Sequence, residues 1–350
     1  MKIAVVGAGL FGSTVAIALS KAGSKVELFD KNDDLLVSAS GINQYRLHRG
    51  YHYPRSIATA ISAKLAAPVF EREYGDALIS TAEHFYCVAR EESKISGRQF
   101  LDFCDACELE YHEESLNGVS KEMVSLIIRA EEKIIDPIRL RGIIRTKILA
   151  GNVCLRLGSY FTRAMLADFD QVVNCAYADL NDMCSVNPEQ RQVYQYELCE
   201  KPIVKLPDLF NNKSVVIIDG PFMCIDPYAN TGYHLMGNVV CAIHASSTGY
   251  YPEIPPRFKP LLNRGVIVDP PVTNIGQFID SAASFMPEIR KAEHIGSMFT
   301  VRAVLPNVDA SDERPTLVWR VNDKIVNVFS GKLGNCVEAS EKVLKVIFGN

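Results

Sequence analysis

The sequence lacks any apolar run that approaches the roughly 20 residues needed to span a bilayer, so no membrane-spanning segment is expected. It also lacks a strong excess of either charge. The formal net charge is −4, and the lysines and arginines are dispersed, which argues against a nucleic-acid surface or a polybasic membrane patch. No internal repeat is visible. With 350 residues, the chain is long enough for about two domains, and we expect a globular cytoplasmic protein.

A zinc-site spacing is also missing, although the chain has ten cysteines. Most of them stand in apolar or strand-like runs, where cysteine behaves as a small buried hydrophobe. Cys104 and Cys107 form a CxxC within a predicted helix over 97–110, but no second ligand pair follows. We therefore expect no metal. No signal peptide is expected either, because glycines interrupt the first apolar run and no A-x-A-like cleavage site follows.

The first thirty residues have the pattern of an adenine-dinucleotide site. A β-branched apolar run over 2–6 leads into a glycine turn over 7–12. A helix is predicted over 13–22, and a second apolar run over 26–29 stops at Asp30. A strand, a glycine turn, a helix and a strand with an acid at its tip form the dinucleotide-binding fingerprint. A lone GxGxxG would be weak, but here the flanking elements and the acid all fit.

Each glycine of the turn has a mechanical role. Gly7 permits the tight turn, Gly9 lets the backbone approach a pyrophosphate, and Gly12 lets the helix pack on the strand. The helix N-terminus offers free N–H groups and a partial positive charge to phosphates. Asp30 is placed to accept hydrogen bonds from the ribose hydroxyls. The predicted cofactor-binding residues of this region are Gly7, Gly9, Leu10, Phe11, Gly12, Asp30 and Lys31.

The remaining pattern predicts an α/β protein with a second, mainly antiparallel domain. A helix over 138–150 follows Asp136 as N-cap and Pro137 at the first helical position. Long strands are then expected over 194–198, 214–219 and 239–244. We predict a discontinuous dinucleotide-binding domain and an α+β substrate domain. The first comprises residues 1–78, 134–188 and 296–350, and the second comprises 79–133 and 189–295.

The polar segment 40–54 carries a recognisable pattern of residues. Its members are Ser40, Gly41, Ile42, Asn43, Leu47, His48, Gly50 and Tyr53. With this pattern the segment resembles FAD-dependent oxidoreductases of the D-amino-acid oxidase (DAO) superfamily, most closely the 2-hydroxyglutarate oxidase branch. Segments 134–140, 172–176 and 330–338 agree with this resemblance, whereas 190–295 matches only loosely.

The resemblance implies a Rossmann-like FAD-binding domain of the glutathione-reductase type, with the flavin facing the sheet of the second domain. FAD is the implied cofactor. The implied reaction is oxidation of a C–N or C–OH bond of an amino acid, amine or 2-hydroxy acid by hydride transfer to flavin N5, with oxygen or another carrier as electron acceptor. The further cofactor-binding residues that it implies are Ser40, Asn43, Gly331, Leu333, Gly334 and Asn335.

The chain also departs from the family pattern. Ala176 is followed by Tyr177 where the family usually has an alanine-glycine pair. The resemblance therefore does not determine the backbone path beside the cofactor. Of the residues that the family commonly has in a late strand, this chain keeps only the arginine, as Arg302. Residues 44–46 replace typically small residues near the flavin, which is expected to narrow the substrate choice.

Three residues are candidates for catalysis. Arg302 would hold a substrate carboxylate through its guanidinium fork, and the alternative is a structural salt bridge. His48 would act as a base, as a flavin contact or as a covalent attachment point, and the alternative is a hydrogen-bonded structural histidine. Lys332, in a glycine loop, would stabilise negative charge on the flavin ring. The salt-bridge partners considered for Arg302 are Asp309, Asp312 and Glu313.

Further residues are expected to line the substrate side. The run 46–55 holds two histidines and three arginines beside tyrosines, which favours a site over a merely solvated face. Tyr228 and His234 follow turn residues in the second domain, and the alternative for them is packing. The predicted substrate-binding residues are Arg46, Tyr53, Tyr228 and His234.

Two other functions stay open at this stage. A flavin monooxygenase would share the first domain, but it would need NAD(P)H, and no second GxGxxG is visible. A non-catalytic dinucleotide-binding protein is the other alternative, and the polar run 46–55 argues against it.

Overall fold

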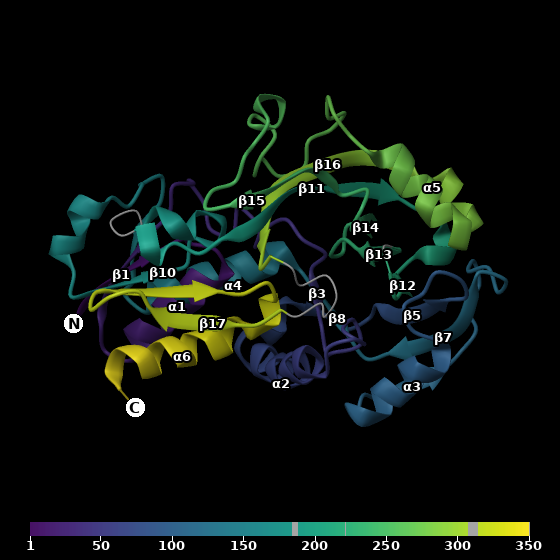
Figure 1. Cartoon of the computed structure of the whole chain (residues 1–350), viewed down its shortest axis with the longest axis horizontal. Coiled ribbons are helices and arrows are strands. Elements are labelled where there is room, and N and C mark those ends of the chain that lie inside the picture. The colour runs from purple at the N-terminus through teal and green to yellow at the C-terminus, as the bar shows by residue number, and fades with distance from the viewer. Residues whose placement is uncertain (184–187, 221, 307–313, 350) are drawn as a thin grey trace.

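The computed structural model describes residues 1–183, 188–220, 222–306 and 314–349. Within these ranges the chain forms a six-stranded sheet, a nine-stranded sheet and a small three-stranded sheet. In Figure 1 the six-stranded sheet lies at the end that holds both termini, and the nine-stranded sheet arches over the other half. None of the helices in the described ranges is long and apolar enough to cross a membrane.

The six-stranded sheet is parallel except at one edge. β1 pairs in parallel with β2 and β10, β10 pairs in parallel with β18, and β17 runs antiparallel to β18. This arrangement confirms the predicted α/β fold with a dinucleotide-binding sheet. The strand order is β17–β18–β10–β1–β2–β9, with β1 at Lys2–Val6, β2 at Lys25–Phe29, β9 at Cys154–Arg156, β10 at Gln171–Asn174, β17 at Leu317–Arg320 and β18 at Ile325–Phe329.

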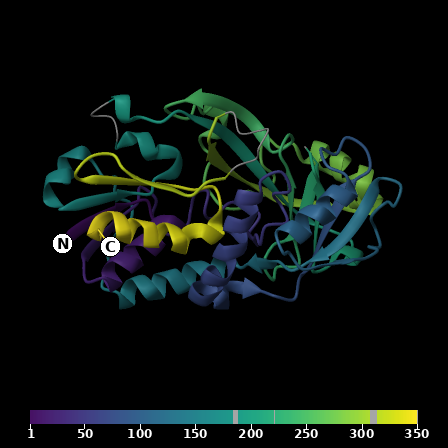
Figure 2. The same ribbon diagram turned by 60° about the horizontal axis from the view of Figure 1, so that its bottom comes forward.

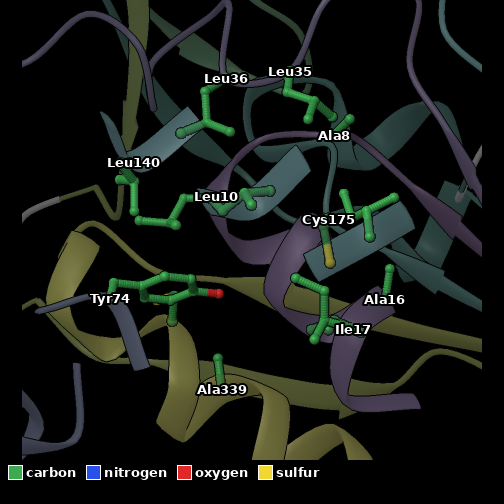
Figure 3. Close-up of a cluster of buried hydrophobic side chains, with 14 of the residues drawn as sticks. Ala8, Leu10, Ala16, Ile17, Leu35, Leu36, Tyr74, Leu140, Cys175 and Ala339 are labelled. Atoms are coloured by element: carbon green, nitrogen blue, oxygen red, sulfur yellow. The ribbon is translucent and has the colours of Figure 1, made fainter. Parts of the chain in front are cut away.

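Helices pack on one face of this sheet through a single apolar core. In Figure 3, Leu10 and Ile17 enter the core together with Cys175, just after β10, and Tyr74 reaches it from α2. The Tyr74 hydroxyl lies 2.8 Å from Thr14 Oγ1, which ties α2 to α1. Figure 2 shows α6 running beside α1, although the two helices are more than 300 residues apart in the chain. The helices are α1 (Leu10–Lys21), α2 (Ile57–Tyr74), α4 (Pro137–Ala150) and α6 (Cys336–Phe348).

The nine-stranded sheet is mainly antiparallel, as predicted for the second domain, with one parallel pair between β5 and β12. Helices α3 (Gly97–Ala106) and α5 (Ile275–Phe285) lie at its far end in Figure 1. Its long strands β11 and β16 pair along their whole length. The strands are β5 (Glu83–Ala89), β6 (Tyr111–Glu113), β7 (Val124–Ala130), β11 (Tyr194–Lys205), β12 (Lys213–Ile218), β13 (Met223–Pro227), β14 (His234–Asn238), β15 (Ile243–Gly249) and β16 (Glu293–Val304).

A small sheet of β3 (Arg46–Leu47), β8 (Lys133–Ile135) and β4 (Leu78–Ile79) lies at the junction of the two large sheets in Figure 1. Its central strand β8 pairs with β3 of the 40–54 segment and with β4. After β8, the Asp136 carboxylate accepts the N–H groups of Ile138 and Arg139 at 3.0 and 3.1 Å. This confirms the predicted start of α4.

Three predicted boundaries differ from the structure. The helix predicted over 97–110 ends at Ala106, and Glu108 takes a left-handed conformation, with a φ of 51°, before β6 begins. The strand predicted over 239–244 is mostly a turn, because Asn238 Oδ1 accepts the N–H groups of Val240 and Cys241 at 2.8 and 2.9 Å. The predicted domain limit at residue 296 falls inside β16, and the pairing of β16 with β11 puts this strand in the nine-stranded sheet.

Candidate functional site

The glycine turn after β1 is packed too closely for any side chain at two positions. A Cβ atom on Gly7 would lie 2.6 Å from the Cys175 carbonyl oxygen, and the φ of Gly7 is 99°. A Cβ atom on Gly12 would lie 1.8 Å from the Gly7 carbonyl oxygen. The turn, the start of α1 and the end of β10 therefore close on one another in the way the fingerprint requires, and the N-terminus of α1 stays available for phosphate groups.

Asp30 forms the second side of the cofactor cradle, which consists of the glycine turn 7–12, the N-terminus of α1 and the tip of β2. Its carboxylate accepts the N–H of Ala8 at 2.6 Å and the N–H of Asn32 at 2.8 Å, so it joins the tip of β2 to the glycine turn. The neighbouring Lys31 forms an ion pair with Asp179. The Asn32 side-chain amide is a third donor, at 2.8 Å. A carboxylate has about four lone-pair sites, so Asp30 keeps about one for a ribose hydroxyl.

The 40–54 segment begins directly over the glycine turn. Ser40 Oγ accepts the N–H of Leu10 at 3.0 Å, and a Cβ on Gly9 would lie 3.0 Å from the same oxygen. Asn43 holds the following turn, because its amide donates to the carbonyl oxygens of Ala39 and Ser40 at 3.1 and 3.0 Å. Residues predicted from the resemblance thus lie against residues predicted from the fingerprint.

The C-terminal loop, residues 330–335, closes the site from the other end of the chain. Lys332 Nζ and the Asn335 amide both donate to Ser62 Oγ of α2, at 3.1 and 3.0 Å. Gly334 accommodates Leu47, whose Cδ1 would lie 3.0 Å from a Cβ at that glycine. Burial lowers the pKa of Lys332 to about 8, so its ammonium form is less favoured than that of an exposed lysine.

These elements surround one cavity of about 390 Å³, the main cavity. It extends from the cradle to the face of the nine-stranded sheet that carries Cys199, Thr300 and Arg302. Among the predicted cofactor-binding residues, Leu10 and Gly12 do not line it but contact Ser40 and Gly7, which do. Gly334 and Asn335 also lie outside the lining. The predicted residues that line it are Gly7, Gly9, Phe11, Asp30, Lys31, Ser40, Asn43, Arg302, Gly331, Lys332 and Leu333.

The inner face of the nine-stranded sheet gives Arg302 a partner that the sequence did not suggest. Arg302 of β16 stands opposite Glu197 of β11 in the pairing of these two strands, and Arg302 Nε donates to Glu197 Oε2 at 2.6 Å. A second guanidinium nitrogen contacts the same oxygen. The carboxylate of a substrate would therefore meet a guanidinium that is already compensated. The partners considered from the sequence, Asp309, Asp312 and Glu313, lie outside the described residues.

A buried ionic cluster is centred on Glu132. Its carboxylate accepts the N–H of Arg49 and the hydroxyl of Tyr86, both at 2.9 Å. His48 Nδ1 lies 3.5 Å away and Arg46 Nε lies 3.7 Å away. Burial alone would raise the pKa of Glu132, but His48 and Arg46 more than offset this and lower the pKa to about 2. Glu132 is therefore ionised, and it faces one nitrogen of the predicted catalytic histidine.

Arg46 lies inside this cluster rather than at the main cavity. It is 5% exposed, and its Nε donates to Asp226 Oδ1 at 3.0 Å. Ser214 Oγ donates to the same oxygen at 2.6 Å. Because Arg46 is buried between Asp226 and Glu132, the geometry gives it a structural role in place of the predicted contact with substrate.

The structure does not bring the other predicted substrate residues to the main cavity. Tyr53 is buried, with its ring 5.6 Å from that of His48. Tyr228 stacks on Tyr45 at 5.7 Å. His234 is buried, and its Nε2 lies 3.0 Å from the Phe210 carbonyl oxygen. His48 itself does not line the cavity, although it is less buried than these residues.

Tyr177 shows how the chain accommodates its departure from the family pattern. Its φ of 55° lies in the left-handed region that favours glycine. Its hydroxyl donates to the Ala303 carbonyl oxygen at 2.8 Å, and its ring stacks on Phe329 at 5.8 Å. These contacts offset the backbone strain, so a tyrosine occupies a conformation normally left to glycine beside the main cavity.

Sequence reasoning also missed part of the cavity lining. Cys199 and Thr300 pair across β11 and β16, and alternation along each strand turns both toward the cavity. Tyr160 and Phe161 line it near Asp30. The strand pattern of the sequence indicates that Cys199 lies in a strand. It does not indicate that this strand pairs with another about a hundred residues later, which brings Thr300 beside Cys199.

The cradle, the acid at the tip of β2 and the loops that close over them fit FAD and define a flavin-dependent oxidoreductase. Residues 2–134 match the DAO family, described as FAD dependent oxidoreductase. The chain is thus similar to this family over its first 134 residues. It is an FAD-dependent oxidoreductase, and FAD is its cofactor.

Relatives with similar sequences are fungal enzymes. The chain is 24% identical over 398 residues to the FAD-dependent monooxygenase kojA of Aspergillus flavus, covering 99% of this chain and 86% of that protein. It is 22% identical to the FAD-dependent monooxygenase FPY4 of Fusarium mangiferae, covering 99% of this chain and 90% of that protein.

Solved structures of the same fold include amino-acid oxidising enzymes. Glycine oxidase from Geobacillus kaustophilus superposes with a TM-score of 0.73 at 15% identity, covering 99% of this chain and 94% of that one. L-proline dehydrogenase from P. horikoshii superposes with a TM-score of 0.71 at 13% identity, covering 99% and 93%. At these identities the likeness concerns the fold.

Proposed function

We propose that this enzyme oxidises a C–N or C–OH bond of a small polar substrate, namely an amino acid, an amine or a 2-hydroxy acid. The observation that supports this most is the main cavity, which is continuous from the cradle to the inner face of the nine-stranded sheet. A substrate can thus lie between that sheet and the cofactor. The 40–54 segment favours the 2-hydroxyglutarate oxidase branch, and oxygen or another carrier in the cytoplasm is the proposed electron acceptor.

The residues of the chain supply charge and position for this reaction. Bound FAD would supply the acceptor for a hydride from the substrate carbon. Ionised Glu132, 3.5 Å from His48 Nδ1, favours a proton on that nitrogen and leaves Nε2 as the basic nitrogen, although His48 lies outside the lining of the main cavity. Lys332 is the cation of the C-terminal loop, and its place in the cavity lining suits stabilisation of negative charge on the flavin.

A flavin monooxygenase is the second candidate, because two relatives that cover 99% of this chain are named FAD-dependent monooxygenases. Such an enzyme would take its electrons from NAD(P)H. The chain shows no second GxGxxG for that cofactor, so reduction of the flavin by the substrate remains the preferred hypothesis.

The two functions separate in one experiment. The absorbance spectrum of the purified holoenzyme is followed under anaerobic conditions while pools of amino acids, amines and 2-hydroxy acids are added. Bleaching of the flavin by one pool supports the proposal and names the substrate class. Bleaching by NAD(P)H alone supports the monooxygenase, and purified protein without flavin would contradict both.

A further inference from the structure

Three strands of the nine-stranded sheet bring Lys201, Gly237 and Cys224 into one row. Ile203 of β11 pairs with Leu235 of the antiparallel strand β14. Lys201 stands two residues before Ile203 and Gly237 two residues after Leu235, so these two residues come opposite each other on the same face. Gly237 in turn pairs with Cys224 of β13. The row lies on the inner face, next to the row that carries Cys199 and Thr300 at the main cavity.

Lys201 is a cation without a partner in this row. It makes no hydrogen bond or ion pair with any residue that the structure describes, in contrast to Lys332, which donates to Ser62. Desolvation lowers its pKa, and the groups that act on it include Cys199 and Cys224 on either side. An ammonium group has three donors, so Lys201 is left with donors for an oxygen of a bound molecule.

Gln44 provides the matching acceptor. Its Nε2 donates to Cys224 Sγ at 2.9 Å, whereas its Oε1 is buried and has no hydrogen-bond partner. The missing side chain of Gly237 makes room for this amide, because a Cβ there would lie 2.2 Å from Gln44 Nε2 and 2.5 Å from Cys224 Sγ. A buried amide oxygen without a donor is costly, which favours a donor from outside the chain.

We propose that Lys201 and Gln44 form a subsite that binds a hydroxyl group of the substrate. A hydroxyl is a small group that can accept from the Lys201 ammonium and donate to Gln44 Oε1 at the same time. A carboxylate would satisfy Lys201 but would leave Gln44 Oε1 without a donor. This subsite rests on the proposed function, since it assigns a substituent to the substrate of the main cavity. Lys201 and Gln44 do not themselves line that cavity, whereas Cys199 in the neighbouring row does. It also gives the replacement of small residues at 44–46 a role in specificity.

The test compares matched ligands on the FAD-loaded protein and on three variants. The probes are pairs that differ by one hydroxyl: L-lactate and propionate, L-serine and L-alanine, ethanolamine and ethylamine. Propionate and propionamide form a further pair that isolates the carboxylate. Calorimetric dissociation constants are measured for wild type, Lys201→Met, Gln44→Met and the control Lys205→Met, which removes an exposed lysine of the same strand. Thermal melting verifies the fold, and Gln44→Met carries the test if Lys201→Met does not fold.

We expect wild type and Lys205→Met to bind a hydroxylated member about tenfold more tightly than its partner, equivalent to about 1.4 kcal/mol. In Lys201→Met and Gln44→Met this preference should fall to within about twofold. The subsite is refuted if no hydroxylated member is preferred, if the preference survives in both variants, or if it follows the carboxylate pair instead. Anaerobic bleaching of the flavin by the same panel tests the proposed oxidation separately, so either idea can fail alone.

Discussion

Replacing Glu132 by glutamine keeps the shape of the side chain and removes its charge from the buried cluster. The carboxylate is fully buried beside Arg46 and His48, and its pKa is lowered from the ordinary 4.5 to about 2. About 2.5 pKa units at 1.36 kcal/mol each correspond to roughly 3 kcal/mol in favour of the ionised native state at neutral pH. We expect Glu132→Gln to lower the free energy of unfolding by about this amount at pH 7.

The sign of the pH dependence follows from the direction of the shift. A carboxyl group with a lowered native pKa stabilises the fold above its unfolded pKa of 4.5, and this stabilisation is lost as the pH falls toward 2. The difference between wild type and Glu132→Gln should therefore shrink between pH 4.5 and 2. Buried His84, with a pKa of about 4, also loses stability in acid. Because the Glu132 charge raises the pKa of His84, this contribution differs between wild type and Glu132→Gln.

The assay is thermal and urea unfolding followed by circular dichroism at several pH values from 7 down to 3. Glu131→Gln is the matched control, because the side chain of Glu131 is 66% exposed in its ion pair with Arg49, and such a pair contributes about 0–1 kcal/mol. A loss of stability at pH 7 no larger than that of the control, or a difference that does not change with pH, would refute the reasoning.

Three further outcomes follow from the site. Gly12→Ala should yield protein without bound flavin or without a fold, because its Cβ would lie 1.8 Å from the Gly7 carbonyl oxygen. The control Gly276→Ala places its Cβ in open space and should keep the flavin. The flavin content after purification is measured for both variants. Tyr177→Phe should cost about 1 kcal/mol in chemical unfolding through the lost hydrogen bond to Ala303, and an unchanged midpoint would contradict that role. Lys332→Met should make the flavin potential more negative at pH 7, and the gap to wild type should narrow above pH 8 as the native lysine loses its proton; equal potentials and turnover would exclude the role assigned to this lysine.

The sequence predicts well the parts of the site that depend on local geometry. The turn at Gly7 and Gly12 and the acid at Asp30 stand within one βαβ unit, so their spacing alone implies their contacts. The segment that begins at Ser40 and the loop around Lys332 were assigned by resemblance, and both line the cavity.

The remaining contacts depend on strand register. Glu197 meets Arg302 because β11 and β16 pair in one register, and a shift of one strand by one residue would turn its side chain to the other face. Arg46 was expected at the substrate, but Asp226, 180 residues later, takes its guanidinium inside the protein. Neither partner can be read from spacing along the chain, because each pair is formed by the tertiary fold.

The six-stranded sheet has a consequence for the order in which this enzyme can be made. β1, completed at Val6, pairs with β10, which ends at Asn174, and β10 pairs with β18, which begins at Ile325. A chain growing on the ribosome therefore exposes an unpaired edge of β10 during synthesis of the next 150 or so residues, which include strands β11 to β16 of the nine-stranded sheet. The loop that carries Lys332 emerges later still. Flavin capture must thus be a late event, and β10 is the strand that most needs protection until β18 arrives.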